Sequence, residues 1–181
     1  VFVFDDELPV IAGSDFTVQL GVDGTADVFV NDTLVSVTDN CGVANVSIST
    51  TSVSCANVGV VSVTLTAVDT SGNVGTDTVL ATVVDEVAPQ IVTVSSLTLE
   101  VGFVGQAMLM PTSLIVSEFD SCGVASRVTN RTLFTCGDVQ TSPHPVLLTV
   151  TDVNNQTTTT VVPVFVTDSA DPYFATPPFD T

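Results

Sequence analysis

The residues of this chain that could do chemistry lie in short segments that occur twice. Asp39-Asn40-Cys41-Gly42-Val43-Ala44 returns 81 positions later as Asp120-Ser121-Cys122-Gly123-Val124-Ala125. Asp69-Thr70-Ser71-Gly72-Asn73 is echoed by Asp152-Val153-Asn154-Asn155-Gln156. Carboxylate and amide oxygens are ligands for a hard cation such as Ca²⁺, and paired cysteines can form disulfides. A fixed period of this size indicates an array of similar modules.

A third signature, D-x-x-x-P, occurs at Asp5–Pro9, Asp85–Pro89 and Asp168–Pro172. Each copy follows a run rich in valine and phenylalanine, which is typical of a final strand. The signature therefore predicts two complete modules, at 5–84 and 85–167. Residues 1–4 are expected to be the last strand of a preceding module, and residues 168–181 the start of a following one.

The charge balance excludes several functions. The chain has 20 acidic residues, two arginines and no lysine, giving a net charge of −18. Such a charge repels phosphate backbones, so a nucleic-acid partner is not expected. No apolar run is long enough to cross a bilayer, so no membrane span is expected in this segment. High solubility and cation binding both account for the acidity, and both readings stay open.

The four cysteines form two pairs of equal spacing, one in each predicted module. Structural zinc sites take four cysteine or histidine ligands, which neither module has. A disulfide within each module, Cys41 with Cys55 and Cys122 with Cys136, is favoured over free thiols. Closing a loop of about 15 residues would stabilise each module by roughly 3 kcal/mol. Disulfides also predict secretion or a cell-surface location.

Alternation of apolar and hydroxyl side chains dominates the sequence, as in Val61–Ala67 and Val146–Thr151. This period of two is typical of strands with one buried and one wetted face, and valine and threonine favour strands. Short strands separated by Gly, Asn and Asp turns predict an all-β sandwich of about seven strands per module. In the first module we expect strands at 9–12, 15–20, 25–30, 43–49, 52–55, 60–68 and 74–84.

These motifs together resemble the HYR (hyalin repeat) module. The resemblance rests on D-N-C-G-V, the second cysteine, V-T-L-T-A-x-D-x-x-G-N and V-x-D-x-x-x-P, and it covers both predicted modules. It implies tandem immunoglobulin-like β-sandwiches in an extracellular adhesion or surface protein, with a binding or spacer role and no enzymatic activity. The second module departs from the pattern at Asp152–Gln156.

An immunoglobulin-like strand order would bring the acidic loops of each module to one pole. Converging carboxylates without a basic partner repel one another unless a cation lies among them, and Ca²⁺ takes six to eight oxygen ligands. The alternative is that Asp and Asn serve only as turn residues that bond their own backbone, with D-x-x-x-P acting as a stiff linker. The predicted calcium ligands are Asp5 or Asp6, Asp39, Asp69 and Asn73 in the first module, and Asp85 or Glu86, Asp120, Asp152 and Asn154 or Asn155 in the second.

Other candidate sites are fewer. N-x-[ST] sequons mark possible N-glycosylation at Asn31, Asn45, Asn130 and Asn155. The only histidine lies in Ser142-Pro143-His144-Pro145, which predicts an exposed loop. One module thus has no histidine at all, so a Ser-His-Asp triad cannot recur in both modules, and no enzyme is expected.

The sequence therefore favours an extracellular, non-catalytic repeat that forms a calcium-stiffened, disulfide-stapled stalk or filament for surface structure or adhesion. Its expected partners are neighbouring identical modules or subunits and a cell-surface glycan or protein receptor. Two alternatives remain: an accessory binding module of a secreted enzyme, and a subunit that polymerises by strand exchange through Val1–Phe4.

Overall fold

The computed structural model describes residues 4–169, and contacts divide the chain into two units, Val1–Val87 and Ala88–Thr181. We call them unit 1 and unit 2 and describe each by itself. Residues 1–3 and 170–181 lie outside the described part, and so do most of the strand predicted at 1–4 and the module start predicted at 168–181.

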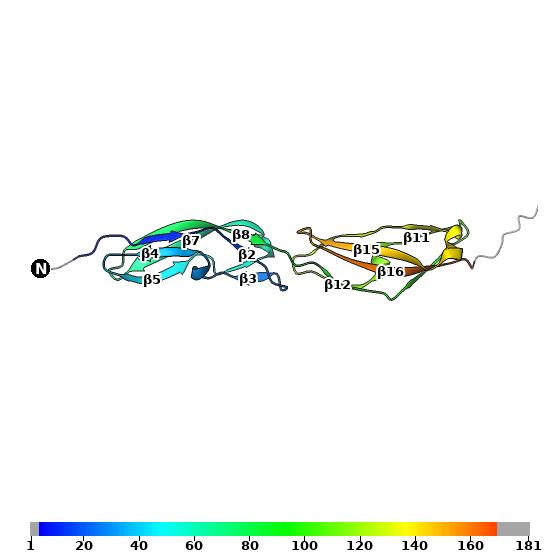
Figure 1. Ribbon diagram of the computed structural model, residues 1–181, viewed down its shortest axis with the longest axis horizontal. Helices are drawn as coiled ribbons and strands as arrows, with labels where there is room; N and C mark the ends of the chain where they lie inside the picture. Colours follow the sequence, from blue (N-terminus) through cyan, green and yellow to red (C-terminus); the bar gives the residue numbers. More distant parts are fainter. Residues whose placement is uncertain (1–3, 170–181) are drawn as a thin grey trace, which may run out of the picture. The chain divides into compact units, whose positions relative to one another are not determined.

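The described part of unit 1, residues 4–87, is built of eight strands and two short 3₁₀ helices. A four-stranded sheet has the order β2-β8-β7-β5, and two-stranded pairs β1-β4 and β3-β6 lie beside it. Strands β7 and β8 run the length of the unit (Figure 1). The bounds are β1 Val10–Gly13, β2 Phe16–Gln19, β3 Thr25–Asp27, η1 Val30–Asp32, β4 Leu34–Thr38, β5 Val43–Ile48, β6 Ser52–Ser54, η2 Cys55–Asn57, β7 Gly59–Asp69 and β8 Val74–Val84.

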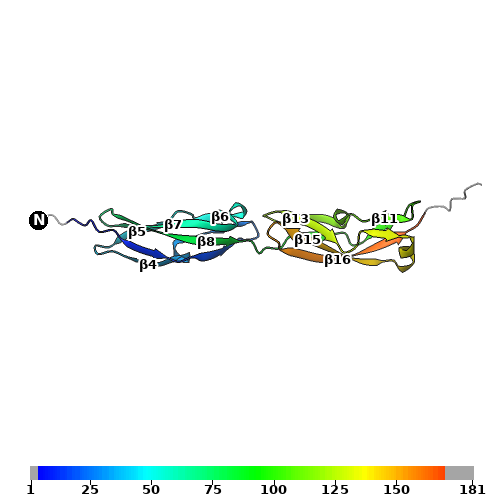
Figure 2. The same ribbon diagram turned by 90° about the horizontal axis from the view of Figure 1, so that it is seen from above.

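Unit 2 repeats the same arrangement, with sheet order β10-β16-β15-β13 and pairs β12-β9 and β11-β14. In both units the second strand pairs in parallel with the last one, β2 with β8 and β10 with β16, while the other pairings are antiparallel. Figure 2 shows unit 2 from above, with β13, β15 and β16 side by side. The bounds are β9 Gln90–Thr93, β10 Leu97–Glu100, β11 Gln106–Met108, η3 Pro111–Leu114, β12 Ile115–Phe119, β13 Val124–Thr129, β14 Leu133–Thr135, η4 Cys136–Thr141, β15 His144–Asp152 and β16 Thr157–Thr167.

The predicted period of two defines the core. On β7 the inward residues Val63, Leu65 and Ala67 are fully buried, and the threonines between them are half-exposed. The same stripe buries Val146, Leu148 and Val150 on β15, with Phe134 of β14 packed against it. The prediction of all-β, tandem immunoglobulin-like β-sandwiches is confirmed. No helix of the described residues has the length and hydropathy needed to cross a membrane.

One strand of unit 1 was not predicted. Leu34–Thr38 forms β4 and pairs antiparallel with β1, so unit 1 has eight strands instead of about seven. The polar 3₁₀ turn η1 interrupts the chain between β3 and β4, and its Asn31-Asp32 pair is typical of a loop. Unit 2 has the same interruption at η3, followed by β12.

Candidate metal centre

Three loops of unit 1 bring three predicted ligands together. Asp5 lies in the segment that leads into β1, Asp39 lies in the β4–β5 loop, and Asp69 ends β7. Each offers a carboxylate oxygen, and these oxygens lie within 4.8 Å of one another. Asp69 is 2% exposed, so this group is part of the folded unit and not a loose acidic surface.

Backbone N–H groups hold one oxygen of each loop carboxylate in place. Asp39 Oδ1 accepts from the N–H groups of Cys41 (2.9 Å) and Gly42 (2.8 Å). Asp69 Oδ1 accepts from those of Ser71 and Asn73, both at 2.8 Å. These are the local turn bonds that Asp favours in loops. The turn chemistry expected as an alternative to a metal site is therefore present.

The second oxygens of Asp5 and Asp39 are not used by the turns. Asp5 Oδ2 and Asp39 Oδ2 are both buried and have no hydrogen-bond partner. A buried acceptor without a partner costs roughly 1–3 kcal/mol, and more when it is charged. Turn bonding and cation binding therefore use different oxygens of the same side chains, and the first does not exclude the second.

Two predicted ligands do not belong to this group. Asn73 directs its amide nitrogen inward, where Nδ2 donates to Asp69 Oδ2 (2.8 Å) and to the Asp5 carbonyl oxygen (3.0 Å). It thus positions the two aspartates instead of offering an oxygen. Asp6 is exposed and lies outside the group, so the choice between Asp5 and Asp6 falls on Asp5.

Charge and burial oppose each other in this group. Burial raises the pKa of Asp69, but hydrogen bonds from the Asn73 side chain and from the backbone of Asn73, Ser71 and Gly72 outweigh it, so the pKa lies below its ordinary value. The neighbouring Cys41 thiol has a raised pKa, first because it hydrogen-bonds to Asp5, and further because of burial and the charges of Asp5, Asp39 and Asp69. Both shifts are those expected for ionised carboxylates.

A second group, Asp85, Asp120 and Asp152, meets the same distance criterion. Asp120 Oδ1 accepts from the N–H groups of Cys122 and Gly123, both at 2.9 Å, as Asp39 does in unit 1. Asp152 is 1% exposed, and its Oδ2 is buried without a hydrogen-bond partner. The carboxylate pattern of unit 1 thus recurs in the second copy.

The divergent loop of unit 2 keeps the same shape. Asp152 Oδ1 accepts from the backbone N–H groups of Asn154 and Gln156, both at 2.8 Å. Asn155 has a φ of 71° where Gly72 of unit 1 has 94°, and asparagine tolerates this left-handed region. Gln156 is therefore the counterpart of Asn73. Glu86 is exposed and outside the group.

The proline of D-x-x-x-P fixes the leading segment to the last strand of each unit. Gly75 on β8 contacts the backbone of Pro9 so closely that an added Cβ would lie 1.9 Å from the Pro9 carbonyl oxygen. In unit 2 the Thr158 hydroxyl donates to the Pro89 carbonyl oxygen at 2.6 Å. In D-x-x-x-P, the aspartate of the acidic group is thus four residues from a buried proline that packs against the last strand.

The predicted disulfides within each module are wrong. Cys41 and Cys136 are free, whereas Cys55 and Cys122 are disulfide-bonded. Cys41 lies beside the end of β7, where the Thr70 hydroxyl donates to its carbonyl oxygen (3.3 Å), but Cys55 precedes the beginning of β7. An eleven-residue strand is roughly 35 Å long, and a disulfide needs Cα atoms within about 7 Å.

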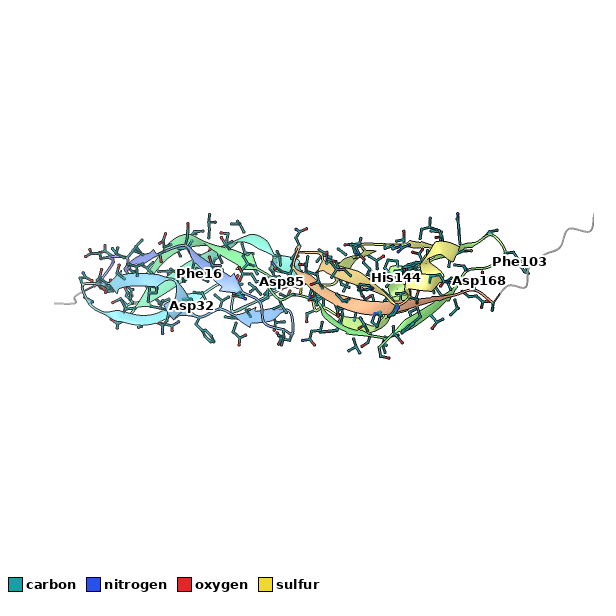
Figure 3. The ribbon with its side chains drawn as sticks, turned by 45° about the vertical axis from the view of Figure 1, so that its right-hand side comes forward. Phe16, Asp32, Asp85, Phe103, His144 and Asp168 are labelled. Carbon is teal, nitrogen blue, oxygen red and sulfur yellow. The ribbon has the colours of Figure 1, made fainter. Side chains whose placement is uncertain are left out.

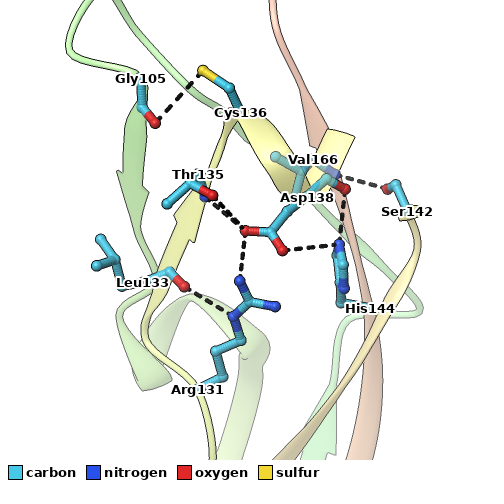
Figure 4. Close-up of polar contacts among 9 residues, drawn as sticks. All are labelled: Gly105, Arg131, Leu133, Thr135, Cys136, Asp138, Ser142, His144 and Val166. Atoms are coloured by element: carbon cyan, nitrogen blue, oxygen red, sulfur yellow. Dashed lines mark hydrogen bonds and ion pairs between the residues drawn. The ribbon is translucent and has the colours of Figure 1, made fainter. Parts of the chain in front are cut away.

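Sequence reasoning missed a polar cluster in unit 2 (Figure 4). Asp138 Oδ2 lies 2.5 Å from an Arg131 nitrogen and accepts from the Thr135 N–H at 2.8 Å. These contacts, with the Arg131 hydrogen bond first, lower the pKa of Asp138 to about 2. His144 was predicted in an exposed loop, but it begins β15, its side chain is 15% exposed, and its ring lies 5.6 Å from that of Phe134.

This cluster is structural. The Arg131 guanidinium lies 4.3 Å from the centre of the Phe134 ring, and the His144 Nε2 lies 2.9 Å from the Asp138 carbonyl oxygen. The other arginine, Arg127, pairs with Glu118. Both arginines of the chain are thus used within unit 2. The position of both arginines within residues 127–131, close to Asp138 in the sequence, was the signal that could have predicted this cluster.

Unit 1 also has a groove, and the sequon asparagines of both units lie on the surface. A groove of about 360 Å³ in unit 1 runs between β2 and β3, and Figure 3 labels Phe16 and Asp32 at its lining. Asp32 uses its Oδ2 to accept from the Phe29 N–H (2.7 Å), so its carboxylate serves the local turn. The predicted glycosylation residues are all exposed: Asn31, Asn45, Asn130 and Asn155.

Comparison with known proteins does not show a family. No family model and no curated protein matches the chain. Human mucin-like protocadherin EC1-2 is 14% identical, with a TM-score of 0.44, over 89% of this chain and 98% of that one. Drosophila N-cadherin EC1-4 is 9% identical, with a TM-score of 0.43, over 89% of this chain and 50% of that one. The titin I-band fragment I67-I69 is 9% identical, with a TM-score of 0.39, over 91% and 67%.

At such low identity and TM-score, these structures carry no inference about what this chain binds.

Proposed function

We propose that this chain is a non-catalytic, extracellular adhesion-type repeat that binds Ca²⁺ at the acidic pole of each sandwich. The observation that carries the proposal is the pair of buried oxygens, Asp5 Oδ2 and Asp39 Oδ2, that have no partner although they belong to a group of three carboxylates. A calcium ion among them would satisfy both oxygens and offset two of the three negative charges of the group.

The donor set favours calcium over other ions. The group offers hard carboxylate oxygens, and backbone carbonyls and water can complete six to eight ligands at roughly 2.3–2.6 Å. Zinc prefers cysteine and histidine, and unit 1 has no histidine. Magnesium demands a nearly ideal octahedron and keeps much of its water, whereas three short side chains fixed by their own turns cannot readily adjust to one geometry.

Binding would change the mechanics of the repeat. Asp5 lies in the leading segment, while Asp39 lies in the β4–β5 loop and Asp69 ends β7. An ion shared among them ties the segment before β1 to the body of the sandwich and removes its rotational freedom. In a tandem array this gives a stiff spacer, which suits a surface stalk or filament whose partners are neighbouring copies of the same module.

Isothermal titration calorimetry on the metal-free chain tests the proposal. We expect calcium binding at two sites, and loss of one site in Asp5→Asn. Asp6→Asn is the matched control, because it makes the same change at an exposed neighbour outside the group. Binding that is equally weak in the wild type and both variants, or equally lost in Asp6→Asn, would refute the assignment.

A further inference from the structure

The two free thiols lie in repeated local structures. Cys41 lies in the β4–β5 loop, and Cys136 begins η4; both are exposed. Each unit has one cysteine in its acidic loop and one in the turn after its short strand, β6 or β14. The free thiol is in the acidic loop of unit 1 and in the opposite turn of unit 2. The two free thiols therefore occupy different positions of the repeat, and each has an equivalent cysteine in the other unit.

Both counterparts are disulfide-bonded. Cys122, the counterpart of Cys41, and Cys55, the counterpart of Cys136, each carry a disulfide. In each unit the bonded cysteine does not bond to that unit's other cysteine, which is free. Each of the two positions therefore carries a disulfide in one of its two copies.

The local geometry at each free thiol matches that of its bonded counterpart. The Cys41 N–H donates to Asp39 Oδ1 at 2.9 Å, as the Cys122 N–H donates to Asp120 Oδ1 at 2.9 Å. At the other position, Cys136 Sγ lies 3.7 Å from the Gly105 carbonyl oxygen (Figure 4). Cys55 Sγ lies 3.6 Å from that of Gly24. Each free thiol is thus presented by a backbone that already supports a disulfide elsewhere in the chain.

An exposed apolar turn accompanies Cys136. Phe103 and Val104 lie between β10 and β11 and are 86% and 82% exposed, and Figure 3 shows Phe103 at one end of unit 2. The Gly105 that closes this turn receives the Cys136 thiol hydrogen bond. Near Cys41, the segment that carries Asp5 exposes Phe4 and Leu8, at 88% and 58%. Apolar side chains of this size suit burial against another surface.

We propose that Cys41 of one copy of this chain forms a disulfide with Cys136 of another copy. The acidic loop of unit 1 in one copy would then join the Phe103 turn of unit 2 in the next. Such a contact is heterologous, because its two surfaces differ, and it generates open chains of copies when the rotation between them does not close a ring. The proposal does not rest on calcium binding.

The chemistry is a two-electron oxidation of the two thiols by a small-molecule disulfide such as glutathione disulfide. One cysteine thiolate attacks the oxidant and releases one glutathione thiolate, giving a mixed disulfide. The second cysteine thiolate attacks the protein sulfur of that mixed disulfide and releases the second glutathione. One S–S bond forms between the proteins, one S–S bond is lost from the oxidant, and the two thiol protons are accepted by the two departing thiolates.

Complementary cysteine variants test the pairing. The wild-type chain, Cys41→Ser, Cys136→Ser and the double variant are incubated in a glutathione redox buffer with a chelator present and separated on a non-reducing gel. The wild type should form a ladder that collapses on reduction. Each single variant should form nothing larger than a dimer, and the double variant should stay monomeric with unchanged circular dichroism.

The decisive sample is an equimolar mixture of the two single variants, each of which keeps the thiol that the other lacks. The mixture should give a dimer faster than either variant alone, and peptide mass mapping should find Cys41 joined to Cys136. Phe103→Ser in the partner that keeps Cys136 should slow this dimer, and Phe103→Leu should restore it. Equal dimer yields from the mixture and the separate variants, or a map that joins Cys41 to Cys55, would overturn the proposal.

Discussion

Replacing Asp39 by asparagine should change the stability of unit 1 in opposite directions with and without calcium. The three carboxylates of Asp5, Asp39 and Asp69 make three repulsive pairs within 4.8 Å, and Asp39→Asn removes two of them. The amide keeps an oxygen for the Cys41 and Gly42 N–H groups. In a chelator, unit 1 of the variant should therefore melt above that of the wild type.

In calcium the order should reverse, because the variant lacks one of the two unpartnered oxygens that the ion would use. Calcium at one hundred times its Kd stabilises the binding state by about 2.7 kcal/mol. For a unit of this size, 1 kcal/mol shifts Tm by roughly 4–8 °C, so the wild-type increment should be roughly 10–20 °C. Asp39→Asn should lose most of it.

Differential scanning calorimetry of the full chain measures both effects, with unit 2 as the internal reference and Asp6→Asn as the charge-matched control. The control should gain the same calcium increment as the wild type. The reasoning is refuted if Asp39→Asn and Asp6→Asn shift the unit 1 transition alike in both conditions, because a diffuse effect of net charge would then account for the data.

Three other perturbations have defined outcomes. Gly75→Ala should displace Pro9, whose carbonyl oxygen would lie 1.9 Å from the new Cβ, and should weaken calcium binding in titration calorimetry more than it lowers Tm in a chelator. Phe134→Ala should lower the unfolding free energy of unit 2 by about 3–5 kcal/mol in urea titrations, because Phe134 is fully buried; a loss below 1 kcal/mol would contradict the packing. Because the pKa of Asp138 is about 2 in the folded chain and about 3.8 unfolded, its ion pair with Arg131 stabilises unit 2 above the unfolded pKa and is lost as pH falls from about 5 towards 2. The urea midpoints of wild type and Asp138→Asn should therefore converge over that range, and a constant gap would contradict the ion pair.

The fold was predictable because its signal is local. Alternating valine and threonine on β7 and β8 appears directly in the sequence, and a half-buried strand needs only that pattern. Strand β4 was not predicted because the 3₁₀ turn η1, with the polar residues Asn31 and Asp32, comes just before it. A pattern broken by a tight polar turn looks like a loop, although the chain then forms β4 and pairs with β1.

The carboxylate group was predictable from topology, but the roles of its members were not. An immunoglobulin-like order explains why loops far apart in sequence meet at one pole. It does not say which atom of Asn73 faces the group. The amide nitrogen faces inward because Asp69 Oδ2 and the Asp5 carbonyl are acceptors that need a donor, and this depends on atomic contacts that a motif does not contain.

The disulfides failed for a geometric reason. Equal spacing of Cys41–Cys55 and Cys122–Cys136 was read as pairing within a module, although equal spacing follows from the repeat whatever the pairing. Cys41 and Cys55 lie at opposite ends of β7, which is too long for a disulfide to span. Comparing each free cysteine with the bonded cysteine at the equivalent position of the other unit instead leads to the pairing that we propose between copies.

The most direct test of a calcium-binding acidic pole is an anomalous difference map from crystals of the chain grown in calcium. The account predicts a peak bound by Asp5 Oδ2 and Asp39 Oδ2 and by a carboxylate oxygen of Asp69, at roughly 2.3–2.6 Å. It also predicts a second peak at Asp85, Asp120 and Asp152. A map without peaks, in which those Oδ2 atoms instead accept hydrogen bonds from ordered water or protein groups, would contradict it.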